Sequence, residues 1–319
     1  MKVLVTLNIP EVGIDMLKNE GLEVEVWREE RPLTHQELVE KTKACTGLLA
    51  TGSNTINQQF LDRCSHIKII SQFGAGYDNI DVDYARKLGI SVGNAPDAMS
   101  DATADIAFGL MLAASRKICY LHKSIIAGGW GHFKPRAHLG LELKGKTLGI
   151  YGMGRIGYEM AKRCVGAYDM QVIYCSRTVK TDAEQAFDAT KVSFEELLEQ
   201  SDVVSVHCAL NQETKGIFDG TAFNLMKETS LFVNTSRGPV HNQGDLYQAL
   251  VSGTIWGAGL DVTDPEPMLP NDPLLSLENV AITPHIGSAT VEARDQMSRL
   301  AAQNIIQFFR GEPVENLVN

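Results

Sequence analysis

The sequence predicts an α/β protein with two domains, each built around a parallel sheet. Short apolar segments alternate with amphipathic helical segments, and this βαβ rhythm runs through both halves of the chain. A long helical stretch and a loop rich in aromatic and basic residues separate the two series. A chain of 319 residues, 44% of them hydrophobic, is large enough to bury two cores.

The first series occupies residues 1–98. Its apolar segments have the length of strands, and helical segments lie between them, as connections between parallel strands require. The predicted strands are residues 2–7, 23–27, 46–50, 67–71 and 90–92, and the predicted helices are residues 10–19, 34–43 and 81–88.

One long helix is predicted over residues 101–127, because apolar side chains recur on one face and Gly128-Gly129 ends the pattern. The second series follows the loop at residues 130–140. Within it, Ser193-Phe-Glu-Glu196 forms a capping box, which predicts the start of a helix. The predicted strands are residues 147–151, 171–175, 202–207, 230–233, 256–260 and 280–282, and the last helix covers residues 291–309.

Composition excludes several classes of function. A net charge of −10 and a pI near 5.3 argue against nucleic acid or an anionic membrane as the main partner. The six cysteines form no C-x-x-C pair, so free thiols are expected rather than disulfides or a metal site. The N-terminal apolar stretch resembles a first strand and is too short for the apolar region of a signal sequence, and no apolar run reaches the roughly 18 residues of a membrane span. A reducing cytoplasm is the expected location.

A glycine-rich turn follows the first strand of the second series and opens a helix. The spacing in Gly152-Met-Gly-Arg-Ile-Gly157 is G-x-G-x-x-G, which alone could be only a tight turn. In this context the first glycine makes the turn, the second admits a pyrophosphate and the third allows close helix packing. We therefore expect a dinucleotide to bind at Gly152, Gly154, Arg155, Ile156 and Gly157.

The strand after this turn indicates which dinucleotide is bound. NAD sites usually end this strand with an acidic residue that binds the ribose hydroxyls. Here the strand ends in Ser176-Arg177-Thr178, which lacks an acid and offers a guanidinium suited to a phosphate. NADP(H) is therefore favoured and NAD(H) remains possible. The alternative is that Arg177 is an ordinary solvated loop charge.

Three charged residues follow three predicted strands of the second series: Arg237, Glu266 and His285. Parallel strands present their carboxyl ends on one edge of a sheet, where α/β proteins bind ligands. A guanidinium, a carboxylate and an imidazole at that edge can hold an anion and move a proton. Each residue also has a structural interpretation: Arg237 as a surface or helix-capping charge, Glu266 as part of a rigid turn between prolines, and His285 as a buried structural histidine.

Five motifs in order make the chain resemble the D-isomer-specific 2-hydroxyacid dehydrogenases, and within them the glyoxylate/hydroxypyruvate reductases. The motifs are residues 74–81, 152–157, 234–238, 261–267 and 284–290. The resemblance implies two Rossmann-like or flavodoxin-like domains, one inserted into the other. Residues 1–99 and 288–319 would form the substrate domain, and residues 100–287 the dinucleotide-binding domain. It also implies a homodimer formed through the inserted domain.

The resemblance further implies the reduction of a small 2-oxo acid to the 2-hydroxy acid, with glyoxylate or hydroxypyruvate giving glycolate or D-glycerate. The amides of Ala75 and Gly76 would hold the carboxylate, Arg237 would orient the substrate, and His285, paired with Glu266, would protonate the carbonyl oxygen. Ser288 would be a further substrate neighbour. The remaining cofactor neighbours implied by the family are Thr103, Ala209, Thr235, Asp261 and Gly287.

Four points weaken or compete with this interpretation. Ala209 stands where the family often has proline, which makes the contact near the nicotinamide less certain. Other members of the family act on lactate, phosphoglycerate, formate or phosphite with the same catalytic residues. A nucleotide-sensing interaction protein with this fold is also conceivable, although the presence of Arg237, Glu266 and His285 together argues against it. A methyltransferase is disfavoured because it would need an acid at the end of the second strand.

Overall fold

The computed structural model describes all 319 residues, and the chain divides into two compact units. One unit comprises Met1–Met99 and Ala289–Asn319, and the other comprises Ser100–Ser288. Each contains one sheet in which every pairing of strands is parallel. The predicted fold class, α/β with two parallel sheets, is therefore confirmed.

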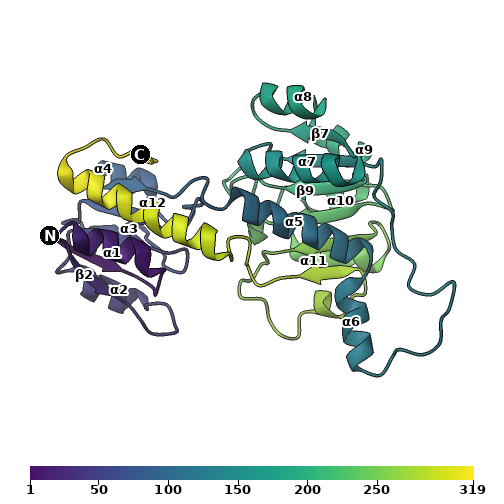
Figure 1. Ribbon diagram of the computed structural model, residues 1–319, viewed down its shortest axis with the longest axis horizontal. Coiled ribbons are helices and arrows are strands. Elements are labelled where there is room, and N and C mark those ends of the chain that lie inside the picture. Colours follow the sequence, from purple (N-terminus) through teal and green to yellow (C-terminus); the bar gives the residue numbers. More distant parts are fainter. The chain divides into compact units, whose positions relative to one another are not determined.

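The first unit has a five-stranded sheet in the order β2-β1-β3-β4-β5. The last helix of the chain, α12, returns to this unit and packs against α1, as Figure 1 shows. A Cβ on Gly13 of α1 would lie 2.3 Å from the Ser298 carbonyl oxygen of α12, so only glycine permits this approach. The strands are β1 Lys2–Val5, β2 Glu23–Val26, β3 Gly47–Ala50, β4 Ile69–Gln72 and β5 Ser91–Gly93, and the helices are α1 Glu11–Asn19, α2 His35–Thr42, α3 Gln58–Arg63, α4 Val82–Lys87 and α12 Val291–Arg310.

The second unit has a seven-stranded sheet in the order β12-β11-β10-β9-β6-β7-β8. The strands are β6 Thr147–Tyr151, β7 Gln171–Cys175, β8 Thr190–Lys191, β9 Val203–Val206, β10 Leu231–Asn234, β11 Gly257–Leu260 and β12 Val280–Ile282. The α-helices are α5 Ser100–Ser115, α6 Ile118–Ile126, α7 Arg155–Tyr168, α8 Thr181–Phe187, α9 Phe194–Gln200, α10 Gly220–Leu225 and α11 Gln243–Val251. Two short 3₁₀ helices, Gly238–Val240 and Pro273–Ser276, complete the unit.

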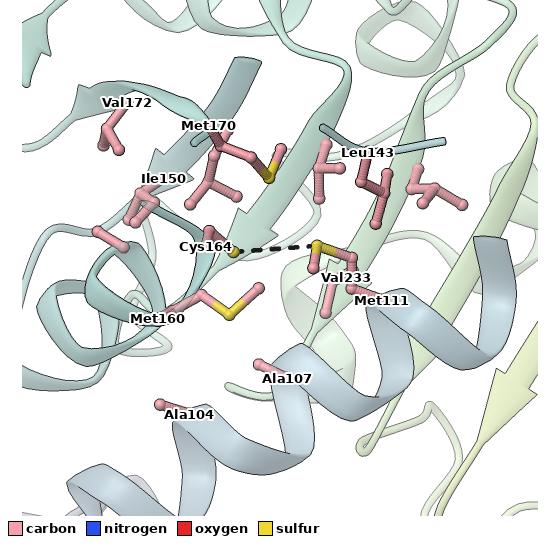
Figure 2. Close-up of a cluster of buried hydrophobic side chains, with 14 of the residues drawn as sticks. Ala104, Ala107, Met111, Leu143, Ile150, Met160, Cys164, Met170, Val172 and Val233 are labelled. Atoms are coloured by element: carbon pink, nitrogen blue, oxygen red, sulfur yellow. Dashed lines mark hydrogen bonds between the residues drawn. The ribbon is translucent and has the colours of Figure 1, made fainter. Parts of the chain in front are cut away.

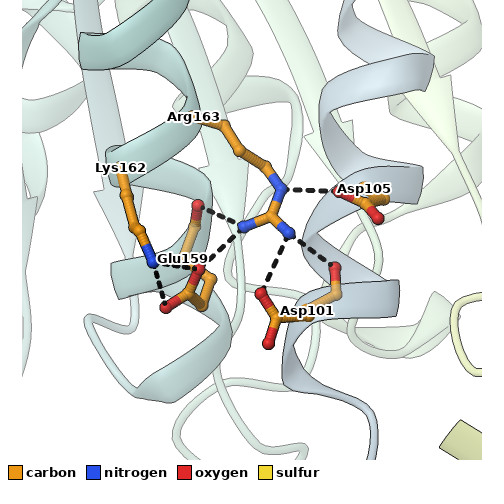
Figure 3. A network of polar contacts seen from close by, with 5 residues as sticks. All are labelled: Asp101, Asp105, Glu159, Lys162 and Arg163. Atoms are coloured by element: carbon orange, nitrogen blue, oxygen red, sulfur yellow. Dashed lines mark hydrogen bonds and ion pairs between the residues drawn. The ribbon is translucent and has the colours of Figure 1, made fainter. Parts of the chain in front are cut away.

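A buried core joins α5 and α7 to this sheet. Figure 2 shows Met111 of α5 facing Cys164 of α7, with the two sulfur atoms 4.0 Å apart. Val233 of β10 lies in the same cluster. At the surface, the Arg163 guanidinium of α7 bonds Asp105 and the first turn of α5 at Asp101 (Figure 3). Together, these contacts hold α5 and α7 against each other and so fix the start of the second unit.

The single helix predicted over residues 101–127 is wrong. The chain breaks between α5 and α6, and Lys117 adopts a left-handed conformation with φ of 56°. The Lys117 ammonium lies 2.7 Å from a Glu278 carboxylate oxygen and 5.2 Å from the centre of the Trp256 ring. These partners are far away in sequence, so the local apolar pattern could not reveal the break. Helix α3 and the two-residue strand β8 are also absent from the prediction.

Other local predictions hold. Ser193 and Glu196 form the expected reciprocal capping box at the start of α9. All six cysteines are free thiols, and Cys45, Cys64 and Cys164 are buried. No helix in the structure combines the length and the apolar character that a membrane crossing would need.

Candidate functional site

The register of the seven-stranded sheet collects the predicted site residues along its carboxyl edge. Tyr151 of β6 pairs with Cys175 of β7 and Val206 of β9, while Asn234 of β10 pairs with Val206 and with Leu260 of β11. Each strand therefore ends at the same level. The residues that follow these strands, with Thr283 after β12, form one row: Thr283, Asp261, Thr235, His207, Gly152 and Ser176.

His285 and Glu266 form a direct pair at this edge. The imidazole Nδ1 donates to Glu266 Oε1 at 2.5 Å, and both side chains are partly exposed, at 45% and 41%. The ring's Nε2 makes no hydrogen bond within the chain, so it is available to a ligand. Burial acts to raise the pKa of Glu266, but the hydrogen bond and charge of His285 and the charge of Arg237 hold it below its usual range. All three predicted catalytic residues are thus brought together.

Asp261 determines the shape of the loop that carries His285. Its carboxylate is buried, and Oδ1 accepts hydrogen bonds from the Thr283 hydroxyl at 2.7 Å and from the Ile286 amide at 2.8 Å. Oδ2 accepts the Gly287 amide at 2.7 Å, and the Asp261 carbonyl accepts the His285 amide at 2.8 Å. His285 itself has a φ of 53°, in the left-handed region that non-glycine residues seldom adopt. The Asp261 carboxylate thus compensates for an unfavourable backbone conformation at His285.

Asn234 holds the loop that carries Arg237, as Asp261 holds the loop that carries His285. Its fully buried side chain accepts from the amide and the hydroxyl of Ser236, both at 2.9 Å, and donates to the Arg237 carbonyl at 2.9 Å. It also bonds His241 Nδ1 at 3.0 Å. Burial lowers the pKa of His241 to about 4, so its ring is neutral and Nδ1 can accept. The partly exposed Arg237 guanidinium donates to the Ser236 carbonyl at 2.8 Å.

The loops after β10 and β11 are in contact. A Cβ on Gly238 would lie 1.9 Å from the Thr263 carbonyl oxygen, which leaves no room for any side chain. Thr263 precedes the segment in which the peptide bonds before Pro265 and Pro267 are cis. Glu266 accepts a backbone hydrogen bond from Thr263 as well. The loops that carry Arg237 and Glu266 are therefore packed against each other.

The glycine turn has the geometry of a phosphate cradle. Gly152 has a φ of +94°, and a Cβ on it would lie 2.7 Å from the Cys208 amide nitrogen. A Cβ on Gly157 would lie 2.9 Å from the Gly152 carbonyl oxygen. Above Gly154 there is open space, and α7 begins there without a side-chain cap. A dinucleotide pyrophosphate therefore fits, with the amides at the start of α7 as donors.

The end of β7 carries Ser176, Arg177 and Thr178. Ser176 Oγ accepts the Met153 amide of the glycine turn at 2.7 Å, which ties the two segments together. Arg177 and Thr178 are exposed. The Arg177 carbonyl accepts Lys191 Nζ of β8 at 3.4 Å. No acidic side chain occupies the strand end, in agreement with the sequence.

The remaining predicted cofactor neighbours lie on or beside the same edge. Thr103 of α5 donates to the Gly287 carbonyl at 3.1 Å, and the Ala209 carbonyl accepts the Thr214 hydroxyl at 2.7 Å. Thr235 Oγ1 lies 3.4 Å from Nδ1 of the largely buried His207. Burial lowers the pKa of His207 to about 3, so it stays neutral and does not serve as a proton donor.

In the first unit, the loop after β4 carries Ala75 and Gly76. The Ala75 carbonyl accepts Asn94 Nδ2 at 2.7 Å, and the Gly74 carbonyl accepts the Ala95 amide at 2.9 Å. The amides of Ala75 and Gly76 donate to no other group of the chain. The loop is thus fixed from its carbonyl side while two adjacent amides remain available to an anion.

Sequence reasoning missed the supporting residues Asn234, His241 and Thr283, and the strand that carries Lys191. Asn234 lies inside a quoted motif and Thr283 directly precedes another, so their positions at strand ends were a usable signal. His241 and Lys191 had none, because their partners are set by the fold.

Comparison with known proteins identifies the family. The model of the D-isomer specific 2-hydroxyacid dehydrogenase NAD binding domain matches residues 108–287, more than half of the chain. The chain belongs to this family. Glyoxylate reductase from Thermococcus litoralis is 43% identical to this chain over 322 residues, and the comparison covers 100% of this chain and 96% of that protein.

Solved structures of the family agree with the fold. A Thermus thermophilus protein superposes with a TM-score of 0.92 at 39% identity, covering 100% of both chains. The NADPH-dependent glyoxylate/hydroxypyruvate reductase from Sinorhizobium meliloti, solved with NADP and malonate, gives a TM-score of 0.86 at 29% identity. That comparison covers 99% of this chain and 96% of the other. The family predicted from the five motifs is therefore confirmed.

Proposed function

We propose that this chain reduces glyoxylate or hydroxypyruvate to the corresponding 2-hydroxy acid, using NADPH in preference to NADH. The observation that carries the proposal is the His285–Glu266 pair, which leaves imidazole Nε2 without a bond in the chain, while the charge of Arg237 acts on Glu266. An acid, its orienting carboxylate and a cation for an anionic substrate are the groups that reduction of a 2-oxo acid requires.

In this reaction the bound nicotinamide supplies the hydride. His285 Nε2 donates a proton to the carbonyl oxygen of the substrate, while Glu266 holds Nδ1 and stabilises the imidazolium beforehand. Arg237 binds the substrate and offsets the negative charge that develops on that oxygen. Asn234 and Asp261 keep these two side chains in place through their buried hydrogen bonds.

We assign the substrate carboxylate to the free amides of Ala75 and Gly76, with Ser288 as a further neighbour. Two adjacent amides that the chain leaves without acceptors form an anion site of the kind glycine-rich loops provide. The substrate domain would then be Met1–Met99 with the C-terminal helix, and the dinucleotide domain the unit that holds the glycine turn.

The dinucleotide would lie on Gly152, Gly154, Arg155, Ile156 and Gly157, with Thr103, Ala209, Thr235 and Gly287 near its nicotinamide end. Asp261 Oδ2 accepts only one donor from the chain, so it retains capacity for the carboxamide. NADPH is preferred because Ser176, Arg177 and Thr178 replace the expected acid with donors. The Sinorhizobium relative is described as NADPH-dependent.

We further propose a homodimer in the cytoplasm. Helix α6 buries none of its residues, and the loop after it carries Trp130 and Phe133 at 79% and 87% exposure. Such an apolar surface needs a partner, and a second copy of the chain is the partner typical of the family. Six free thiols suit a reducing compartment. Analytical ultracentrifugation of the purified protein tests the dimer.

The decisive experiment compares initial rates of NADPH and NADH oxidation with glyoxylate and with hydroxypyruvate, using His285→Ala as the control. We expect NADPH oxidation to fall by on the order of 10³-fold in the variant, because the proton donor is lost. An NADH preference would contradict only the cofactor assignment. Absence of turnover with either cofactor would contradict the substrate class, and retained dinucleotide binding would then favour a sensing role.

A further inference from the structure

Two cations at the end of β7 lack carboxylate partners. Arg177 and Lys191 form no ion pair, although the chain carries 39 acidic and 29 basic residues. Lys117, Lys162 and Lys227 of the same unit each pair with a carboxylate, whereas other exposed lysines such as Lys146 do not; what distinguishes Arg177 and Lys191 is that the two cations are adjacent. In a chain with excess negative charge, two adjacent cations without counter-charges indicate a place for an external anion.

The fold brings Lys191 to this place from β8, an edge strand of only two residues. Register pairs Lys191 with Tyr174, three residues before Arg177 in the chain. The Lys191 ammonium reaches over the strand end and donates to the Arg177 carbonyl at 3.4 Å. Burial raises the pKa of the Cys175 thiol, and the charge of Lys191 acts against this rise while that of Glu195 adds to it, so Lys191 lies near Cys175. The Lys191 ammonium therefore lies close to the turn that carries Arg177.

The chemistry of this turn suits a phosphate monoester. Such a group carries about −1.5 to −2 charges at neutral pH, more than one guanidinium neutralises. Arg177 can offer a planar fork and Lys191 a compact point charge. Ser176 uses its hydroxyl oxygen to accept the Met153 amide, so its hydroxyl hydrogen is still free to be donated.

We propose that Lys191 is a second cation for the 2′-phosphate of NADP(H), so that β8 as well as β7 selects the dinucleotide. This inference rests on the cofactor preference proposed above and adds a specificity-determining residue to it. Dinucleotide choice is then made by residues from two strands whose proximity follows from the parallel pairing of β7 and β8.

The test measures binding by calorimetry to the protein without cofactor, with adenosine 2′,5′-bisphosphate and 5′-AMP as probes. The first probe carries the 2′-phosphate and the second does not. We expect Lys191→Met to weaken bisphosphate binding by about five- to tenfold, and 5′-AMP binding by less than about twofold, because only the first probe reaches the ammonium. Lys191→Arg should restore most of the loss.

Lys146→Met is the matched control, since Lys146 is an exposed lysine just before β6, at the amino ends of the strands of the same sheet. It should leave both affinities unchanged. If Arg177→Met weakens bisphosphate binding and Lys191→Met does not, the role of Lys191 is overturned while the NADPH preference stands. If the unmodified protein binds both probes equally, the NADPH preference itself fails. An equal loss for both probes in Lys191→Met would indicate a structural role and also overturn the proposal.

Discussion

The two ends of the carboxyl edge of the seven-stranded sheet are built differently. At the β10–β12 end, the buried side chains of Asn234 and Asp261 fix the loops that carry Arg237 and His285. At the β7–β8 end, Arg177 and Lys191 are exposed, and one weak contact to a carbonyl joins them. Proton transfer needs atoms held within tenths of an ångström, whereas recognition of a charged group tolerates flexible cations. The difference matches the proposed division between catalysis and cofactor selection.

The largest effect at the rigid end is expected from Asp261→Asn. One oxygen would become an NH₂ group, placing a donor against the Gly287 or Ile286 amide in a buried site. We expect the free energy of unfolding to fall by about 1–3 kcal/mol. The rate constant kcat should fall by on the order of 10²-fold, because His285 shifts. Denaturant unfolding measures the change in stability, and steady-state kinetics measure the change in kcat. Thr283→Val, which removes one of the three donors, should have a smaller effect on each.

Asn234→Ala should weaken substrate binding more than it slows proton transfer. The Arg237 carbonyl and the Ser236 amide would lose their buried partner, at a cost of about 2–3 kcal/mol of stability. We expect KM for the 2-oxo acid to rise by about tenfold as Arg237 loses its fixed position. His241→Phe, which keeps a buried ring and removes the nitrogen that accepts from Asn234, should have a smaller effect. A change in kcat alone would contradict this role for Asn234.

Glu266→Gln tests the His285–Glu266 pair through the pH dependence of kcat/KM. The imidazolium of His285 loses its carboxylate, so the high-pH limb of kcat/KM should move to lower pH and the maximum should fall by about tenfold. In the parent protein the folded-state pKa of Glu266 lies below its ordinary value of 4.5. The pair therefore stabilises the fold above that pH, and this contribution is lost as the pH falls through the lowered pKa. An unshifted profile in the variant would contradict the pairing.

The smallest effect belongs to the exposed end. Raising the salt concentration should weaken NADPH binding by about two- to threefold more than NADH binding, because exposed cation–phosphate contacts are screened. Fluorescence titration of the bound dinucleotides at several ionic strengths measures the difference. Equal salt dependence for the two dinucleotides would mean that the cations near β7 do not contact the 2′-phosphate.

Much of the fold was predictable because it is encoded by local patterns. Alternating apolar and amphipathic segments indicated two parallel sheets, and the glycine spacing after β6 indicated the phosphate turn. The break at Lys117 was not predictable, since Glu278 and Trp256 stabilise it from distant parts of the chain. The short strand β8 was missed for a different reason, because two residues carry no periodicity.

The sequence alone determined which chemical groups this protein has and the order in which they occur. Arg237, Glu266 and His285 each follow a strand, and parallel strands present their ends on one edge, so their meeting could be expected. Only the tertiary structure decided how they are held. The Asp261 carboxylate positions the backbone of the His285 loop through the amides of Ile286 and Gly287, which lie 25 and 26 residues further along the chain. Such hydrogen bonds depend on the register between strands and on burial, which arise only when the whole sheet has formed.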